Sequence, residues 1–216
     1  MDRSTRLAIL ASLVTLGLWA GSAAASTIVL PRAGQVGFGI QGQYGTLLST
    51  GDLGKEFGSG AGLVVKVRYR MRFERAIGLT FDVQQLDARD PAGNSHLEGG
   101  AFDTLETSSQ PGLRDRLKMV TAGVEFYQLF DTRERTTKML SVSGGLVQLS
   151  AHLTDGETQY PIAGDGVFLG AGAGVERFFF RSWALDLSSK YMMIVHDGTI
   201  NHDFQLQLGL MFYAAY

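Results

Sequence analysis

The stretch Phe204-Gln-Leu-Gln-Leu-Gly-Leu-Met-Phe-Tyr-Ala-Ala-Tyr216 decides the fold predicted for this chain. Successive side chains of a β-strand point to opposite faces, so residues that share parity share a face. One parity here is polar or small, with Gln205, Gln207 and Gly209. The other is apolar and aromatic. Such a strand suits a barrel that has lipid outside and a polar interior. The apolar set consists of Phe204, Leu206, Leu208, Leu210, Phe212 and Tyr216.

The first residues have the pattern of an export signal. Arg3 and Arg6 precede an apolar run over 7–20, and Ala23-x-Ala25 has the small residues of a cleavage site. The run falls short of the roughly 20 residues that a membrane-spanning helix needs, which disfavours an anchor helix. We therefore expect residues 1–25 to be a signal peptide, 26–33 a lead-in segment and 34–216 one barrel domain.

The composition excludes several classes of function. The chain has no cysteine, which excludes a disulfide framework and thiolate chemistry. Without Asp2, Arg3 and Arg6 it has 17 Lys and Arg against 20 Asp and Glu, so no basic surface for nucleic acid is indicated. We predict no cofactor. The 28 glycines and 4 prolines suit an all-β chain with many turns.

The same alternation recurs along the chain and predicts eight antiparallel strands in an up-and-down transmembrane barrel. Expected connections after the second, fourth and sixth strands are short. Longer polar ones are expected at 48–58, 85–116, 149–165 and 192–201. Short turns on one side, longer loops on the other and an aromatic belt near the turn ends are typical of such barrels, and residues 212–216 are expected to belong to this belt. The predicted strands are 35–47, 63–73, 77–84, 117–130, 138–148, 166–180, 183–191 and 204–216.

The inward face of the predicted strands is charged. Eight strands enclose an interior just wide enough for side chains, so we expect these charges to pair across the lumen and plug it. Counting through the turns places Asp82 about opposite Arg68 and Glu176 about opposite Asp186. Arg68 or Arg70 is expected to reach the last two carboxylates from the far wall. The expected lumen ion network is Lys66, Arg68, Arg70, Arg72, Asp82, Glu125, Glu176, Asp186 and Lys190.

Other interpretations of these residues stay open. Glu176 and Asp186 could form an acid–base pair. Ser188 and Ser189, with His196, could belong to a lipid hydrolase, although no Gly-x-Ser-x-Gly is present. The expected long loops, with His202 and Asp203 counted as part of the last one, are rich in Asp and Glu and hold all four histidines. This is compatible with divalent-cation binding but shows no specific ligand spacing.

Three segments carry a family resemblance: Gly170-Ala-Gly-Ala-Gly-Val-Glu-Arg-Phe-Phe-Phe180, Trp183-Ala-Leu-Asp-Leu-Ser-Ser-Lys-Tyr191 and the aromatic last strand. With them the chain resembles the small OmpA/OmpX-type outer-membrane β-barrels of Gram-negative bacteria. The resemblance implies an outer-membrane location among lipid and lipopolysaccharide. It also implies insertion by the barrel-assembly machinery, which reads the last strand as an assembly signal.

Such barrels serve different functions, so the resemblance alone names no activity. We expect a monomeric, non-enzymatic barrel with a structural or cell-surface interaction role through its loops, above all through 85–116. A narrow channel, a lipid-modifying enzyme and a soluble periplasmic barrel remain as alternatives.

Overall fold

The computed structural model describes residues 30–88, 116–155, 158–180 and 182–214. The expected signal peptide, residues 26–29 of the lead-in, most of the 85–116 segment and Tyr216 lie outside these ranges. Eight antiparallel strands and one short helix make up the described part. Their bounds are β1 Val36–Leu47, α2 Asp52–Glu56, β2 Phe57–Arg72, β3 Arg75–Ala88, β4 Arg116–Phe130, β5 Thr136–Asp155, β6 Thr158–Phe180, β7 Trp183–His196 and β8 Thr199–Tyr213.

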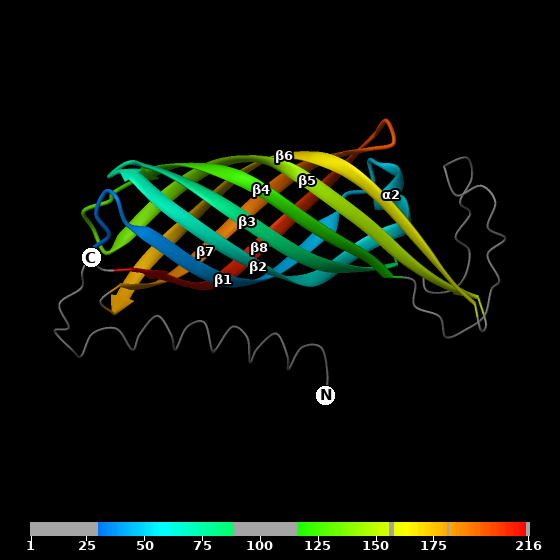
Figure 1. Cartoon of the computed structure of the whole chain (residues 1–216), viewed down its shortest axis with the longest axis horizontal. Coiled ribbons are helices and arrows are strands. Elements are labelled where there is room, and N and C mark those ends of the chain that lie inside the picture. The colour runs from blue at the N-terminus through cyan, green and yellow to red at the C-terminus, as the bar shows by residue number, and fades with distance from the viewer. Residues whose placement is uncertain (1–29, 89–115, 156–157, 181, 215–216) are drawn as a thin grey trace.

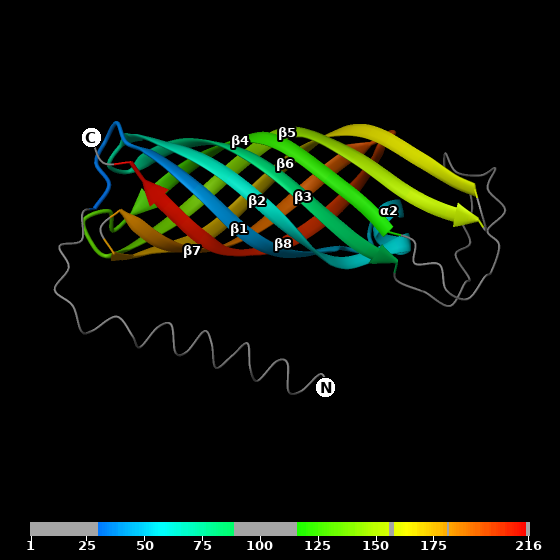
Figure 2. The ribbon, with the colours of Figure 1, turned by 60° about the horizontal axis from the view of Figure 1, so that its bottom comes forward.

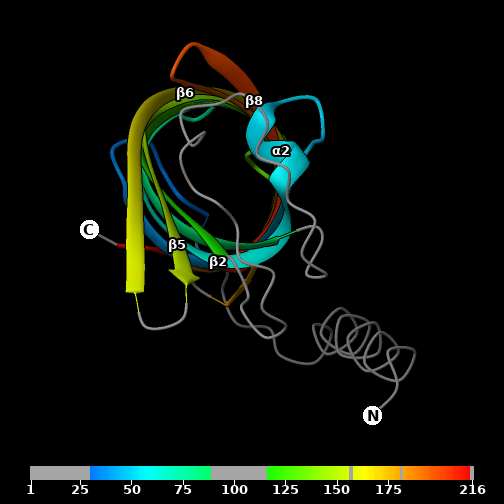
Figure 3. The same ribbon diagram turned by 90° about the vertical axis from the view of Figure 1, so that its right-hand side faces the viewer.

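The strands close into a barrel in sequence order, and β8 pairs with β1 (Figures 1 and 3). Closure leaves no edge of unpaired backbone groups, which a lipid environment could not satisfy. Gly209 allows a close approach at this seam, because a Cβ there would lie 2.1 Å from the carbonyl oxygen of Ile40. The predicted all-β fold with eight strands is confirmed.

The two faces of the barrel differ as the alternation predicts. Outward residues are apolar and exposed: the exposed fraction is 67% for Leu146 and 68% for Leu169. Inward Gln205 and Gln207 of β8 are buried. Water-soluble monomers rarely expose an apolar surface that runs round the whole molecule, so this outer face suits a lipid environment. No helix among the described residues is long and apolar enough to cross a membrane.

The barrel has two unlike ends. The turn end, as we name it, holds the short connections β2–β3, β4–β5 and β6–β7, the start of β1 and the end of β8 (Figure 2). The loop end, opposite, holds α2 and the connections β5–β6 and β7–β8. In the end-on view, α2 lies at the rim of the ring (Figure 3).

Two of the expected long connections are wrong, and the one expected at 48–58 is present but contains a helix. Residues 149–165 are mostly strand, because β5 and β6 continue to Asp155 and from Thr158. In 192–201 the strands are separated by Asp197 and Gly198 alone, which have φ of 47° and 76°. Positive φ at both central residues is the geometry of a type I′ hairpin turn, for which Asp-Gly is a preferred sequence. In 48–58, α2 and the start of β2 replace part of the loop.

Candidate functional site

The candidate site is the polar layer that crosses the middle of the lumen. Apolar side chains close the lumen on both sides of this layer. At the turn end, Phe178, Ala184 and Met211 pack with Tyr213, and Leu129 and Met139 pack with Tyr127. The loop-end apolar cluster comprises Leu47, Leu53, Leu86, Leu117, Met119, Val147, Leu149, Ala151, Phe168, Met192 and Ile194.

The centre of the polar layer is an arginine that bridges two carboxylates. Arg68 of β2 places Nη1 3.2 Å from Glu176 Oε1 and Nη2 3.1 Å from Asp186 Oδ2. Glu176 and Asp186 are register partners on β6 and β7. Their like charges therefore need a cation between them, and the planar guanidinium can serve both at once. All three side chains are fully buried.

Arg70 and two tyrosines complete this ion pair network. Arg70 Nη2 lies 3.1 Å from Glu176 Oε2. The Tyr213 hydroxyl donates to Glu176 Oε1 over 2.7 Å and lies 3.2 Å from Arg68 Nη1. The Arg68 guanidinium also stacks over the Tyr127 ring, 4.2 Å from its centroid. Each of these four charged groups thus has an oppositely charged partner, which offsets part of the cost of burial. Arg68 Nε, Arg70 Nε, Arg70 Nη1 and Asp186 Oδ1 have no hydrogen-bond partner among the described residues.

A second group of charges lies beside the first. Lys190 Nζ is 2.9 Å from Glu125 Oε1, and the Tyr127 hydroxyl donates to the same carboxylate. Lys66 Nζ donates to Gln207 Oε1 over 2.7 Å. A cavity of about 10 Å³ lies among these residues, which is about the space that one water needs. It has no room for an organic substrate.

Amide side chains surround the remaining carboxylates. Gln205 Nε2 donates to Asp203 Oδ2 over 2.8 Å and lies 3.4 Å from Asp82 Oδ2. Gln43 of β1 also donates to Asp82. The primary amides can donate and accept at once, so they link the carboxylates of β3 and β8 across the lumen.

Small residues make room for this layer. Gly170, Gly172 and Gly174 point inward on β6, and a Cβ at Gly170 would lie 2.7 Å from Ser143 Oγ. A Cβ at Gly172 would lie 2.8 Å from Ser141 Oγ, and a Cβ at Gly174 would lie 2.7 Å from Ser188 Cβ, so small side chains of β5 and β7 lie against these glycines. The Gly-rich stretch of β6 was noticed in the sequence only as part of the family resemblance.

The structure places eight of the nine predicted network residues in the lumen. Arg72 instead is exposed at the turn end, where the register shift between Arg70 and Arg72 ends the regular alternation. The predicted pairing of Asp82 opposite Arg68 is also wrong, because Arg68 pairs with Gly78 and Asp82 with Val64. The β2–β3 turn is tighter than expected, and the pairing of β2 with β3 is therefore shifted from the register expected from the sequence.

Sequence reasoning missed two members of the layer. Asp203 was assigned to a loop, but it is fully buried inside β8. Tyr213 was grouped with the outer aromatic residues, although its parity matches the inward Gln205 and Gln207. The parity that Asp203 and Tyr213 share with Gln205 and Gln207 is enough to predict that both side chains face the lumen. Among the described residues, the lumen then holds four Lys or Arg against five Asp or Glu.

The arrangement does not bring together a hydrolase site from the predicted serines. Ser188 Oγ lies 3.5 Å from Gln207 Oε1, and Ser189 Oγ lies 3.4 Å from the carbonyl oxygen of Ala173. His196 is at the far end of β7, about 25 Å along the strand at about 3.3 Å per residue. In the described ranges, no three His, Cys, Asp or Glu side chains are grouped to hold a metal.

The outward residues of β8 also have defined positions. Phe204, Leu206, Leu208, Leu210 and Phe212 are all exposed on the outer face. Their predicted role as an assembly signal stays a prediction, and Tyr216 lies outside the described residues.

Comparisons with known proteins support the fold. No family model matches the chain, and no curated protein sequence matches it. Neisserial surface protein A matches with a TM-score of 0.54 and 15% identity, over 82% of this chain and 96% of that one. Ail, the attachment invasion locus protein of Yersinia pestis, matches with a TM-score of 0.54 and 15% identity, over 84% and 100%. OprG from Pseudomonas aeruginosa matches with a TM-score of 0.51 and 12% identity, over 88% and 100%.

The closed barrel and these likenesses define the class of fold. The chain has the fold of the small eight-stranded outer-membrane β-barrels, the OmpA/OmpX-like class predicted from its sequence. Identities of this size establish the fold and leave the role to the features of this chain.

Proposed function

We propose that the chain is an outer-membrane barrel that presents its loop end at the cell surface and acts there by contact with other molecules. Under this proposal residues 1–25 are the cleaved export signal, and the barrel is a monomer inserted by the barrel-assembly machinery. Lipid and lipopolysaccharide surround its apolar outer face. The proposal includes no catalytic step.

The observation that carries the contact role is the β5–β6 hairpin. The last β4 partner on β5 is His152, and the first β7 partner on β6 is Val167. Residues 158–166 of β6 therefore pair with β5 alone and extend beyond β7 by about 30 Å at about 3.3 Å per residue. On the other side, residues 153–155 of β5 extend beyond the described part of β4 by about 10 Å. Figures 1 and 2 show both strands projecting past the rest of the barrel. A long projection on a rigid scaffold is suited to binding.

The closed lumen favours contact over transport. Within the described residues, the charges of the polar layer are ion-paired or hydrogen-bonded to glutamine side chains, and apolar clusters flank the layer at both ends. The name of Ail, an attachment invasion locus protein, is compatible with a surface role for this fold. The proposal itself rests on the hairpin and the closed interior of this chain.

Cysteine labelling tests the topology, because the chain has no cysteine of its own. We expect Asp155→Cys, in the hairpin, to react with a membrane-impermeant maleimide on intact cells. The matched variant Arg133→Cys, in the β4–β5 turn, should react only after the outer membrane is permeabilised. Labelling of Arg133→Cys on intact cells, or recovery of the protein in the soluble periplasm, contradicts the proposal.

Shortening the hairpin tests the contact role. Replacing residues 152–161 by Asn-Gly joins the register partners Ala151 and Ile162 with a type I′ turn. Cells with the wild-type barrel should aggregate in suspension more than cells with the shortened barrel at equal surface expression. The exposed turn-end variant Arg133→Gln is the control. Equal behaviour of the wild-type and shortened barrels would refute a role for the hairpin.

A further inference from the structure

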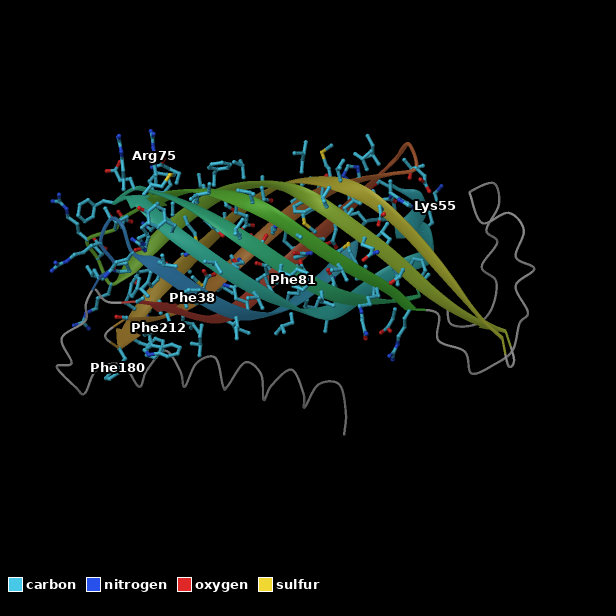
Figure 4. All side chains as sticks on the ribbon, viewed as in Figure 1. Phe38, Lys55, Arg75, Phe81, Phe180 and Phe212 are labelled. Carbon is cyan, nitrogen blue, oxygen red and sulfur yellow. The ribbon has the colours of Figure 1, made fainter. Side chains whose placement is uncertain are left out.

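The turn end carries a group of exposed cations that the lumen network does not use. Within the described residues this end has three exposed acidic side chains, Glu74, Asp131 and Glu134, against seven exposed basic ones. Figure 4 shows nitrogen-tipped side chains at the end where Arg75 is labelled, with Lys55 at the opposite end. The basic side chains, which we call the turn-end cations, are Arg32, Arg72, Arg75, Arg133, Arg135, Lys138 and Arg177.

Most of these cations have no anionic partner among the residues that the structure describes. Lys138 Nζ lies 2.8 Å from Asp131 Oδ2. The other six make no ion pair with any residue in the described ranges. The loop end differs: its described part has as many exposed acidic as basic side chains, and the 89–115 segment has five acidic residues against two arginines in its sequence.

The turn-end cations lie next to aromatic side chains on the outer face. Trp183 and Phe180 are register partners there, and Trp183 packs on Phe212 with ring centroids 5.0 Å apart. Arg177 shares the outward parity of Val175 and Phe179 and is exposed. An arginine among apolar side chains extends its guanidinium toward the polar headgroup region, where it needs an anion or water.

We propose that the turn-end cations bind the phosphodiester headgroups of anionic phospholipids in the membrane leaflet at this end. This inference rests on the proposed membrane location. Arginine forks match phosphate oxygens in geometry and charge, and the adjacent aromatic rings suit the headgroup level of a bilayer. The cations extend from Arg32, which precedes β1, to Arg177 of β6 instead of converging on one pocket, which fits a lipid surface better than a single soluble ligand.

Trp183 provides a probe at the proposed site. The sequence has two tryptophans, so Trp19→Phe leaves Trp183 alone whether or not residues 1–25 are removed. The protein is reconstituted in vesicles in which either phosphatidylglycerol or phosphatidylcholine carries bromine, and quenching of Trp183 fluorescence is measured. We expect the association constant for phosphatidylglycerol to be roughly fivefold that for phosphatidylcholine at low salt. A preference of this size is what about one basic residue contributes at an anionic membrane surface. High salt should remove the preference.

Two double variants of equal charge change locate the effect. Arg135→Gln with Arg177→Gln removes cations near Trp183, since the Arg135 carbonyl accepts a hydrogen bond from Phe178 of β6. This variant should lose the preference for phosphatidylglycerol. Arg116→Gln with Lys118→Gln removes two exposed cations at the loop end and should keep it.

The outcomes separate this inference from the proposed function. Absence of quenching by either brominated lipid would overturn the membrane location itself. Equal quenching by both lipids in the wild type, at low salt, would overturn lipid binding and assign the cations to a soluble acidic partner. A preference that survives in the Arg135 and Arg177 variant would overturn the assignment to these residues.

Discussion

At the scale of single residues, Arg68 holds the polar layer together. It contacts Glu176 and Asp186, which belong to two strands that are distant from β2 in the sequence. A buried ion pair of this kind adds little stability compared with a well-packed apolar core, but removal of one partner leaves the others charged and unpaired. The network therefore penalises any closure in which β2 does not face β6 and β7.

The variant Arg68→Ala tests this role. We expect it to lower the free energy of unfolding by about 3–5 kcal/mol, because two buried carboxylates lose their common cation. Urea unfolding in lipid vesicles, followed by fluorescence, measures the change. Arg72→Ala, on the same strand but exposed, should stay within about 0.5 kcal/mol of the wild type. Similar losses in both variants would show that the buried pairs do not govern stability.

At the scale of elements, β8 combines two surfaces in one strand. Its inward amides hold Asp82 and Asp203, while its outward face is exposed and apolar. The antiparallel pairing of β8 with β1 makes both faces continuous with the rest of the barrel. A register slip by one residue would exchange the two faces, which is why alternation specifies register so strongly.

Substitution of outward residues of β8 by arginine measures where lipid begins. Leu208→Arg, in the middle of the strand, should cost about 2–4 kcal/mol, because it places a charge near the centre of the bilayer. Ile200→Arg, beside the Asp197–Gly198 turn, should cost about 0–1 kcal/mol, since the side chain can reach water. The measurement is again reversible unfolding in vesicles. Equal costs at the two positions would refute the assigned depth.

At the scale of the whole molecule, the lumen is closed in layers. Apolar clusters lie toward the loop end and the turn end, and the paired charges lie between them. An eight-stranded barrel has an interior that its side chains just fill. Neutralising one member of the middle layer leaves both apolar layers in place.

This layering predicts the conductance of the barrel. In planar bilayers we expect no current steps from the wild type or from Arg70→Ala. A general porin added to the same membrane serves as the positive control. Steps that scale with protein concentration in either form would contradict the closed lumen and favour the narrow-channel alternative.

The sequence by itself determined the eight-strand alternation and the inward face of most strand positions. These features depend on parity, which is local and has a period of two residues. Parity predicted Arg68, Glu176 and Asp186 as lumen residues. It also held the signal for Asp203 and Tyr213, which a loop assignment and an aromatic-belt assignment obscured.

Only the tertiary structure decided where the strands end and which partners most of the inward charges meet. Contacts across the lumen depend on the stagger of strands round the closed ring, which alternation does not encode. Arg68 meets Glu176 and Asp186 as predicted, whereas Asp82, expected opposite Arg68, meets Gln43 and Gln205. The sequence did not reveal the full lengths of β5 and β6. At their far ends these two strands pair only with each other, and the polar residues of such a hairpin resemble those of a loop.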